Sequence, residues 1–330
     1  MGIILVTGGA GFIGSHLVRA LVKEGHEVRV LDNFSTGFLD NLEDVKHRIE
    51  LLDGDIRQPE VVKSAMKRVQ LVFHQAALAS VPRSIKDPAA TTHVNVLGTV
   101  NVFEAARAAK VRRVVYASSS SVYGDSPEVL RRETGPVNPL SPYALSKLVG
   151  EQYGAFYAQD FELETVGLRY YNVFGPRQDP LSQYAAVIPK FISALSAGQS
   201  PVIYGDGEQF RDFTYVENVV QANLLASRVP GVSGCVFNVG CGQSLTVNEL
   251  CRILAELLEV DEPPSYQPAR LGDARYSKAD ITLAGEYLGY APTVDVQEGL
   301  RRTVAWYRSA EGEARLAFRR RPTAAMAVNR

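Results

Sequence analysis

The chain has 330 residues, of which 46% are hydrophobic and 22% charged, and its formal net charge is −1. This composition is typical of a globular protein with a full core, and the length predicts one large domain or two unequal ones. The small net charge offers no field to attract nucleic acid or a membrane surface. Three cysteines without a CxxC spacing argue against a disulfide framework and a metal site, so a reduced, cytoplasmic setting is expected. The short apolar run at the N-terminus predicts a buried strand and neither a signal peptide nor a membrane span.

The first part of the chain alternates short β-branched runs with longer amphipathic segments. The predicted strands are IILVTG (3–8), EVRVLD (27–32), IELLDGD (49–55), LVFHQA (71–76), RVVYAS (113–118) and TVGLRY (165–170). The predicted helices between them span 12–24, 59–68, 88–109 and 142–159. This alternation predicts an α/β fold, a Rossmann-type doubly wound parallel sheet with helices on both faces.

After about residue 175 the pattern changes to proline-marked loops and more widely spaced elements. We expect a first domain over 1–175 and a smaller α/β substrate-binding domain over 176–310, with segments near 211–240 returning to the first. Helices are predicted near 184–197, 246–258 and 296–308, with a strand at 201–204. Residues 311–330 lack a period and predict a solvated tail, with a binding role for Arg319–Arg321 as the alternative.

A glycine-rich loop, TGGAGFIG (7–14), follows the first predicted strand and opens the first predicted helix. Gly8 permits the tight turn, Gly11 lets the backbone approach a pyrophosphate, and Gly14 lets helix and strand pack closely. Asp32 closes the second predicted strand, where a carboxylate can accept both ribose hydroxyls of an adenosine and repels a 2′-phosphate. The pattern therefore predicts a dinucleotide site for NAD rather than NADP. Asp55–Ile56 could hold the adenine, or Asp55 could cap a helix.

Tyr143 and Lys147 lie four residues apart on one predicted helix and therefore share a face. Free tyrosine titrates at about 10, and a nearby ammonium together with an oxidised nicotinamide lowers that value. The phenol then becomes a usable general acid and base. The run ASSSSVYG (117–124) ends the fifth predicted strand, where its hydroxyls can reach a substrate oxygen. The alternative interpretations are core packing for Tyr143, a solvated charge for Lys147, and helix or turn caps for the serines.

Together these segments resemble the extended short-chain dehydrogenases/reductases, and within them the nucleotide-sugar epimerases, over roughly residues 2–310. The motifs that carry the resemblance are TGGAGFIG (7–14), Asp32–Asn33, HQAA (74–77), NVLGT (95–99), SSSSVYG (118–124), YALSK (143–147), RYYNVFGPRQ (169–178), RDFTYVEN (211–218) and FNVG (237–240). The resemblance implies NAD held throughout turnover, a UDP-sugar bound between two domains, and a homodimer formed through the helices near 88–109 and 142–159.

The resemblance also implies roles for particular residues, with Tyr143 as acid and base, Lys147 orienting it, and Ser119 as the hydroxyl on the sugar O4. The further cofactor-binding positions that it implies are Phe12, Ile13, Asn33, Ala76, Asn95 and Tyr170. The implied substrate-binding positions are Ser120, Ser121, Asn172, Ala186, Val187, Arg211, Arg270, Asp273 and Ser277. Among the substrate-binding residues, Arg211 and Arg270 are expected to grip the diphosphate and Asp273 the ribose.

Within this family the residues favour 4-epimerisation through a transient 4-keto sugar. The related 4,6-dehydratases carry an acidic pair where this chain has Ser120–Ser121, and a serine supplies no carboxyl proton. A dehydratase, a UDP-glucuronate decarboxylase and a cofactor-sensing binding protein remain the alternatives. The resemblance places Ser277 at the position that walls the sugar pocket in this family. Its small side chain, together with Ala185 and Ala186, implies room for the N-acetyl group of UDP-N-acetylglucosamine or UDP-N-acetylgalactosamine, beside UDP-glucose and UDP-galactose. A one-residue slip would place the bulky Tyr276 there instead.

Overall fold

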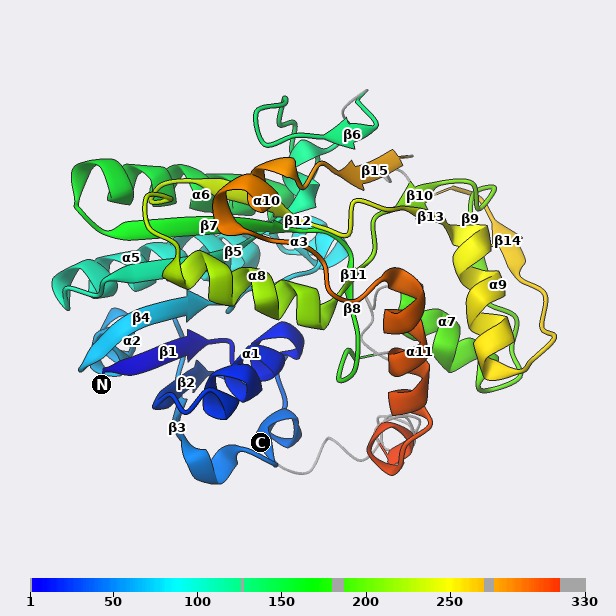
Figure 1. Cartoon of the computed structure of the whole chain (residues 1–330), viewed down its shortest axis with the longest axis horizontal. Helices are drawn as coiled ribbons and strands as arrows, with labels where there is room; N and C mark the ends of the chain where they lie inside the picture. The colour runs from blue at the N-terminus through cyan, green and yellow to red at the C-terminus, as the bar shows by residue number, and fades with distance from the viewer. Residues whose placement is uncertain (1, 126–127, 180–186, 270–275, 315–330) are drawn as a thin grey trace.

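The structure, a computed structural model, describes residues 2–125, 128–179, 187–269 and 276–314. A large sheet flanked by helices forms one unit, and a smaller unit lies beyond the tips of its strands (Figure 1). The predicted substrate residues Ala186, Arg270 and Asp273 lie outside the described residues, as does most of the predicted tail.

The large sheet has seven parallel strands in the order β12-β7-β5-β4-β1-β2-β3. Its strands are β1 (Ile3–Thr7), β2 (Val28–Asp32), β3 (Ile49–Asp53), β4 (Val69–His74), β5 (Arg113–Ser119), β7 (Glu164–Tyr170) and β12 (Val236–Val239). Six of the seven confirm the predicted strands, and the predicted Rossmann-type fold is confirmed. The strand order reverses between β1 and β4, and in open parallel sheets the crevice at such a point, outside the carboxyl ends of the strands, is where ligands bind.

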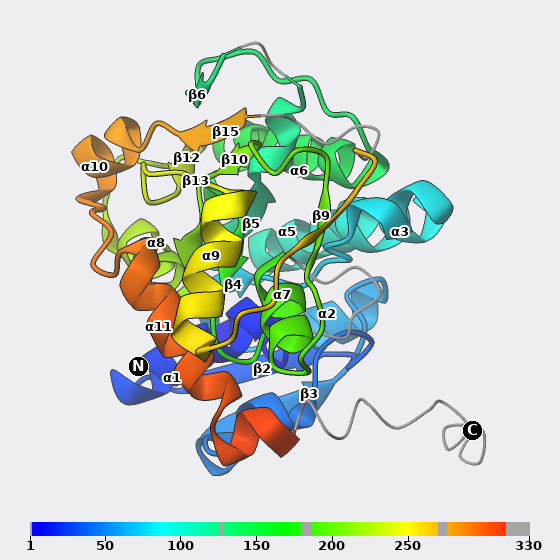
Figure 2. The ribbon, with the colours of Figure 1, turned by 90° about the vertical axis from the view of Figure 1, so that its right-hand side faces the viewer.

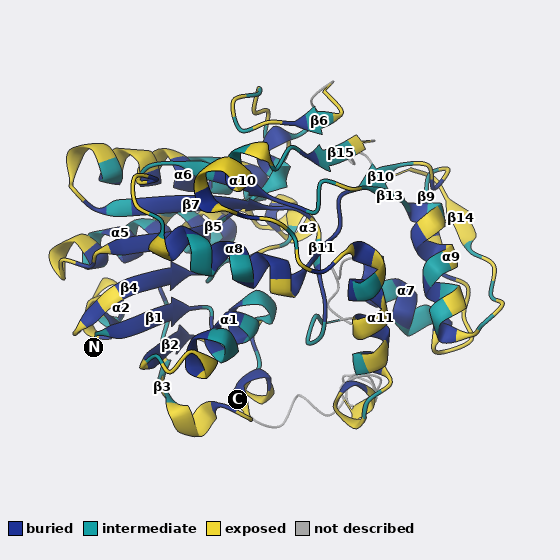
Figure 3. Cartoon of the chain, viewed as in Figure 1, coloured by how far each residue is buried: buried dark blue, intermediate teal, exposed yellow. Residues whose placement is uncertain are grey.

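Helices cover both faces of this sheet. On one face lie α1 (Phe12–Lys23), α8 (Val216–Arg228) and α10 (Thr282–Leu288), and on the other lie α2 (Pro59–Ala65), α5 (Gly98–Ala108) and α6 (Pro142–Asp160). Each layer buries an apolar core against the strands, which are buried along most of their length (Figure 3).

The predicted helix over 88–109 is confirmed as helical backbone that continues from Pro88 to Ala108, but it contains a π-helical turn. The segment divides into α4 (Pro88–Thr92), a π-helical turn (His93–Leu97) and α5, and an unpredicted α3 (Val81–Lys86) precedes them. Side-chain caps explain the division before α4, because Asp87 accepts a hydrogen bond from the Ala90 amide and starts a new helix.

The smaller unit packs α7 (Val187–Leu195), α9 (Val247–Leu258) and α11 (Val296–Tyr307) around a core of their own (Figure 2). The predicted helices near 246–258 and 296–308 are confirmed, and a capping box between Thr246 and Glu249 starts α9. Short strands join the units: β13 (Leu245–Thr246), β10 (Phe210–Arg211), β15 (Tyr276–Ala279) and β6 (Leu130–Arg131) form one sheet, while β9 (Val202–Tyr204) pairs with β14 (Ser265–Gln267) and β8 (Val173–Phe174) with β11 (Thr214–Tyr215).

Three 3-10 turns complete the described elements, at Leu39–Leu42, Lys46–Arg48 and Ser120–Tyr123. In the described part of the chain, every helix is too short or too polar to cross a membrane.

Candidate active site

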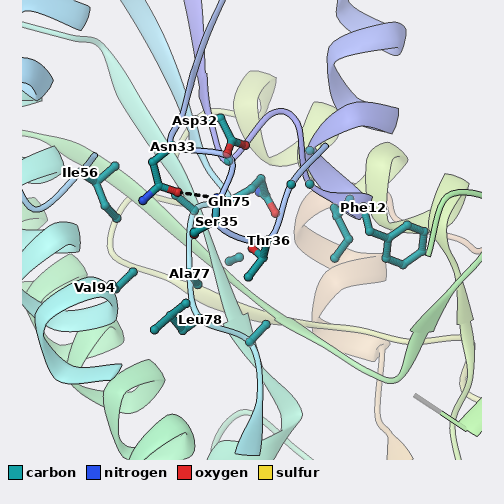
Figure 4. A pocket seen from close by; sticks show the side chains of 18 of the residues that line it. Phe12, Asp32, Asn33, Ser35, Thr36, Ile56, Gln75, Ala77, Leu78 and Val94 are labelled. Carbon is teal, nitrogen blue, oxygen red and sulfur yellow. Dashed lines mark hydrogen bonds between the residues drawn. The ribbon is translucent and has the colours of Figure 1, made fainter. Parts of the chain in front are cut away.

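A pocket opens at the carboxyl edge of the large sheet, where β1, β2, β4 and β5 end beside α6 (Figure 4). It brings together most of the residues for which the sequence predicts cofactor binding. The predicted residues that line it are Gly8, Gly11, Phe12, Ile13, Gly14, Asp32, Asn33, Asp55, Ile56, Ala76, Tyr143, Lys147 and Tyr170. Their binding roles stay predictions, but their convergence on one pocket is a fact of the fold.

The glycine loop forms a cradle that larger side chains would fill. Gly8 has a positive φ of 69°, and a Cβ there would lie 2.6 Å from the Ala76 amide nitrogen. A Cβ on Gly14 would lie 2.1 Å from the Gly8 carbonyl oxygen, so α1 can approach β1 only with glycine at this position. Gly11 is the N-cap residue of α1, and no described side chain caps this helix start, so its first turn presents amides and the positive end of the helix dipole to the pocket.

Asp32 is buried at the end of β2 and lines the same pocket. Its carboxylate accepts hydrogen bonds from the Ala10 amide at 2.9 Å and the Phe34 amide at 2.9 Å. Burial raises the pKa of this carboxyl, and the two amides oppose that rise. Asp32 therefore joins the glycine loop to the strand end, with remaining lone pairs available to a ribose.

Asp55 does not cap a helix, because α2 begins at Pro59 with Gln58 in the N-cap position. It accepts hydrogen bonds from the Arg57 side chain and from Asn33 Nδ2 at 2.8 Å. The Arg57 guanidinium is the main reason that the pKa of Asp55 falls to about 2. The carboxylate is therefore ionised at the rim of the pocket near neutral pH.

Asn95 lies behind the pocket wall and is missing from the residues that line it. Its side chain accepts a hydrogen bond from the Leu78 amide at 2.8 Å, and it donates to the Leu78 carbonyl at 3.2 Å and to Ser146 Oγ at 3.0 Å. Ser146 Oγ in turn donates to the Tyr143 carbonyl at 2.7 Å. In this arrangement Asn95 holds the wall segment around Leu78 against the start of α6.

Tyr143 lies in the first turn of α6, directly after Ser141, which caps the helix by accepting a hydrogen bond from the Ala144 amide at 3.1 Å. Burial raises the pKa of the Tyr143 phenol, and a hydrogen bond with Ser119 opposes that rise. The expectation that Lys147 lowers the pKa of Tyr143 is wrong for the protein side chains alone. Ser119 is the described residue that favours the phenolate, and desolvation outweighs its effect on the pKa.

Lys147 follows one turn later and lies in the same pocket. Its ammonium donates a hydrogen bond to the Ala117 carbonyl at 2.8 Å and lies 5.9 Å from the centre of the Tyr143 ring. Burial lowers the pKa of Lys147 to about 8, and the charge of Glu151 opposes that decrease. The ammonium is thus charged near neutral pH and close to its titration point.

The serine run divides its hydroxyls between two tasks. Ser118 Oγ donates to Glu151, whereas Ser119 hydrogen-bonds Tyr143 and also accepts from the Ser121 amide at 3.2 Å and the Ser121 hydroxyl at 2.8 Å. Ser119 is therefore also the cap of the 3-10 turn, which confirms the cap interpretation, while its catalytic role stays a prediction.

Four of the described residues predicted to bind substrate, namely Asn172, Val187, Arg211 and Ser277, lie outside the set that lines this pocket. Arg211 on β10 pairs in register with Ser277 on β15, so these two predicted residues are neighbours in one sheet. Tyr276 is directed to Phe210 instead, with ring centres 4.8 Å apart. Because side chains alternate along a strand, Ser277 and Tyr276 face opposite sides of β15.

Asn172 and Val187 lie in separate segments that lead into the smaller unit. Asn172 has a positive φ of 30° and donates a hydrogen bond to the Asp212 carbonyl at 2.8 Å. Val187 begins α7. The residues that line the cofactor pocket include neither of these two nor Arg211 and Ser277.

Sequence reasoning missed several residues of the pocket wall. They are Leu31, Ser35, Thr36, Gly37, Gly54, Gln75, Ala77, Leu78, Ala79, Val94, Ala117 and Ser118. The wall on the far side of Asp32 is the loop after β2, in which the Ser35 amide donates to Asn33 Oδ1 at 3.1 Å (Figure 4). A position directly after a carboxyl-edge strand end was the available signal for most of them. Within the described ranges, His, Cys, Asp and Glu form no group of three that could hold a metal ion.

Comparisons with known proteins agree with this geometry. Residues 4–240 match the NAD dependent epimerase/dehydratase family. The UDP-glucose 4-epimerase of Mycolicibacterium smegmatis is 42% identical over 309 residues, which cover 92% of this chain and 98% of that protein. More distant relatives include the dTDP-D-glucose 4,6-dehydratase of Homo sapiens, 33% identical over 92% of this chain and 89% of that protein.

Solved structures with the same fold are also similar along nearly the whole chain. The UDP-glucose 4-epimerase of Thermotoga maritima with UDP-glucose superposes with a TM-score of 0.89 at 39% identity, covering 93% of this chain and 98% of that one. The UDP-N-acetylglucosamine 4-epimerase of Methanobrevibacter ruminantium in complex with UDP-N-acetylmuramic acid has a TM-score of 0.88 at 41% identity, with the same coverage.

Proposed function

The chain belongs to the NAD dependent epimerase/dehydratase family, and from this premise we propose that it catalyses the NAD-dependent 4-epimerisation of a UDP-sugar. The observation that carries the proposal is the single pocket in which Tyr143, Lys147 and the glycine loop converge, with Ser119 bonded to the phenol. Relatives and solved neighbours whose names specify UDP-sugar 4-epimerases support the choice of reaction.

The pocket fits NAD on its own chemistry. Glycine at positions 8 and 14 lets the loop pack closely against backbone beside the pocket, and the start of α1, which has no side-chain cap among the described residues, suits a pyrophosphate. Asp32 offers carboxylate oxygens to the adenosine ribose and would repel a 2′-phosphate. Bound there, NAD supplies a nicotinamide ring that takes up and returns a hydride, and its oxidised form adds a positive charge.

In the proposed mechanism Tyr143 moves the proton. Its phenolate accepts the proton of the sugar 4-hydroxyl, and the same phenol returns a proton to the 4-oxygen after the 4-keto sugar has turned its other face. Ser119 donates to that oxygen and so holds it beside the phenol. Lys147 keeps its ammonium 5.9 Å from the centre of the Tyr143 ring, and an oxidised nicotinamide would supply the positive charge that favours the phenolate against the effect of burial. Oxidation of the sugar C4 in the first half of the proposed reaction would be reversed by reduction in the second half, so the full cycle consumes no oxidant.

The geometry favours epimerisation over dehydration. Loss of the sugar 6-hydroxyl as water needs an acid beside it, and the two residues after Ser119 are serines. Ser121 is moreover engaged with the Ser119 hydroxyl at 2.8 Å. A dehydratase therefore remains the second candidate, supported by the 33% identical relative and opposed by these side chains.

We further propose that the pocket accepts N-acetylated as well as plain UDP-hexoses. Ser277 on β15 pairs with Arg211 on β10, the residue proposed to bind the diphosphate, so the two share one face of the small sheet. Tyr276 packs against Phe210 instead. The small side chain is thus the one that faces the proposed substrate side, which leaves room beside the sugar C2. The N-acetyl-sugar epimerase among the solved neighbours supports the same substrate range.

Product analysis tests the reaction. The purified protein is incubated with UDP-N-acetylglucosamine or UDP-glucose, without added cofactor, and the sugars are separated after hydrolysis. The proposal predicts the galacto isomer of one or both substrates. A product lighter by water or carbon dioxide would instead assign a dehydratase or a decarboxylase, and absence of turnover on both sugars would favour a binding protein.

A homodimer is the proposed assembly. α6 carries Leu145 at 51% and Phe156 at 49% exposure, and the neighbouring π-helical turn and α3 add Leu97 at 51% and Ile85 at 63%. Phe103 on α5 and Tyr157 on α6 are buried in the core and do not belong to this exposed apolar face. Sedimentation tests the proposal: Phe156→Glu should shift a dimer to monomer, and a wild-type monomer at micromolar concentration would contradict it.

A further inference from the structure

Glu151 lies on α6 one turn after Lys147 and two turns after Tyr143, so all three share one helix face. Its side chain is only 4% exposed, which is unusual for a carboxylate. Neither the proposed proton transfer nor the cofactor site uses it, so its burial at the catalytic helix needs another explanation.

The partner of this carboxylate is Arg169 on β7, itself 7% exposed. Arg169 Nε donates to Glu151 Oε1 at 2.8 Å and Nη2 donates to Oε2 at 2.7 Å, a bidentate pairing. The third nitrogen, Nη1, donates to the Tyr123 hydroxyl at 2.8 Å, and that hydroxyl donates to Asn238 Oδ1 at 2.7 Å. The guanidinium lies 4.7 Å from the Tyr123 ring centre. Each of the three guanidinium nitrogens therefore has a hydrogen-bond partner.

The end of β5 is tied to α6 by three successive residues. The Ala117 carbonyl accepts from Lys147, the Ser118 hydroxyl donates to Glu151, and Ser119 hydrogen-bonds Tyr143. Because neighbouring residues of a strand end cannot shift independently, the contact that holds the middle residue also sets the other two. Ser118 is that middle residue, and Glu151 holds it.

The negative charge of Glu151 also acts on the ammonium of Lys147, whose pKa it raises against the effect of burial. The groups around Lys147 are Glu151 and Tyr143 on α6 and His74 on β4. Burial lowers the pKa of His74 to about 3, so this imidazole is neutral, and the Tyr143 phenol is protonated in the protein alone. Glu151 is thus the anion that keeps Lys147 charged against desolvation.

We propose that Glu151, held by Arg169 and Ser118, is a positioning residue that sets both the place of Ser119 against Tyr143 and the charge of Lys147. It touches no reacting atom and acts through these neighbours. The inference rests on the proposed function for the roles of Tyr143 and Lys147, but its electrostatic part can be measured without turnover.

Competitive acylation of lysines over a pH series, followed by mass spectrometry, gives the pH of half-labelling for Lys147. In Glu151→Gln we expect this pH to fall by about one unit, because the neighbouring negative charge is gone while Arg169 stays. Arg169→Gln should raise it, because the negative charge then lacks its counterion. The opposite signs separate electrostatics from a general loosening of the fold, and Arg169→Gln alone decides the matter if Glu151→Gln does not fold.

A matched control lies on the same strand. Arg113 at the start of β5 is buried and paired with Glu164 at 2.9 Å, at the other end of the strand from the pocket. Glu164→Gln removes the same chemical group and should leave the half-labelling pH of Lys147 unchanged. Equal values in wild type, Glu151→Gln and Arg169→Gln would overturn the electrostatic role.

The positioning role is tested on turnover of UDP-sugar. Glu151→Gln should lower kcat about tenfold with little change in KM, and it should move the alkaline limb of the pH–rate profile to lower pH. Glu151→Asp, which keeps the charge, should restore the limb. A kcat loss that merely follows the fall in Tm, as in Glu164→Gln, would make Glu151 structural only. If wild type itself turns over no UDP-sugar, the proposed function fails, while the Lys147 titration still decides the electrostatic role.

Discussion

The carboxyl edge of the large sheet and the small sheet β13-β10-β15-β6 carry different parts of the proposed chemistry. At the large edge, the loop, strand ends and helix that hold Gly8, Asp32, Tyr143 and Lys147 belong to long, regular elements. In the small sheet, Arg211 lies on a strand of two residues, paired with a strand from a distant segment. From this difference we expect the proposed reaction to depend on the edge of the large sheet, and the proposed choice of sugar to depend on the small sheet.

Two buried aspartates illustrate the contrast. Asp32 accepts two backbone amides and still lines the cofactor pocket. Asp212 accepts the amides of Cys241, Gly242 and Ala279 at 2.8, 2.9 and 3.2 Å, and so ties β10 to the segments beside it. The same side chain thus lines the pocket proposed for NAD in one region and holds backbone segments together in the other.

The largest expected effect concerns the carboxyl edge of the large sheet. Tyr143→Phe should lower kcat by a factor of about 10² to 10⁴ or more, because Tyr170, the other described phenol that lines the pocket, is held by hydrogen bonds to Gln75 and Asn223. NAD should stay bound, which absorbance of the purified variant measures. Tyr116→Phe removes a buried phenol from β5 outside the pocket and should keep its activity. Turnover by Tyr143→Phe close to wild type would separate the pocket from the reaction.

Asp32→Asn should weaken NAD binding by about ten- to a hundredfold, because a charge-assisted hydrogen bond to the ribose is lost. Activity should return when NAD is added in excess, and discrimination against NADP should fall. Asp53→Asn is the control, since Asp53 pairs with Asp32 across β2 and β3 but is exposed. Retention of NAD by Asp32→Asn as strong as in that control would rule out the ribose contact.

Ser277→Tyr tests whether the small sheet sets sugar choice. The bulky ring should raise KM for N-acetylated UDP-sugars at least about tenfold while plain UDP-hexoses are nearly unaffected, because only the former need space at C2. Tyr276→Ser, on the opposite side of β15, is the matched control and should not produce this selectivity. Undiminished N-acetyl activity in Ser277→Tyr would remove the pocket-wall assignment.

The smallest effect concerns pH and stability in the small sheet. Burial raises the pKa of Asp212 from 3.8 to about 6, so the folded protein favours the protonated form. Its contribution to stability is therefore full below about pH 4 and is lost as pH rises through about 6, by about 3 kcal/mol at most. Relative to Asp212→Asn, wild type should lose Tm between pH 4 and pH 7. Parallel Tm curves for the two proteins would show that burial does not act on this carboxyl.

Much of the large sheet and its carboxyl edge could be predicted from the sequence. β-branched runs mark its strands, and the glycine loop and the Tyr143–Lys147 pair are local patterns whose spacing fixes which residues share a face. α8 escaped prediction because polar residues interrupt its apolar period: Asn218 and Asn223 are fully buried and bond the Val294 carbonyl and the Tyr170 hydroxyl. Such partners become visible only in three dimensions.

The rest depends on contacts between distant segments. Strands as short as β10 and β6 carry no period, and their pairing with β15 follows from tertiary packing. The roles of Glu151 and Arg169 were equally hidden, because a glutamate in a helix is ordinarily exposed and its partner lies on another strand. The expected effect of Lys147 on Tyr143 failed for the same reason, since desolvation is a property of the folded pocket.

The central claim is that one resident NAD and the Tyr143–Lys147 pair invert C4 of a UDP-sugar. UDP-glucose and UDP-N-acetylglucosamine, each with deuterium at C4, are incubated with purified protein and no added cofactor, and the product is analysed by NMR. The account predicts a galacto isomer that keeps the label at C4, because hydride leaves and returns within one site. A galacto isomer without the label, or no isomer from either sugar, would contradict it.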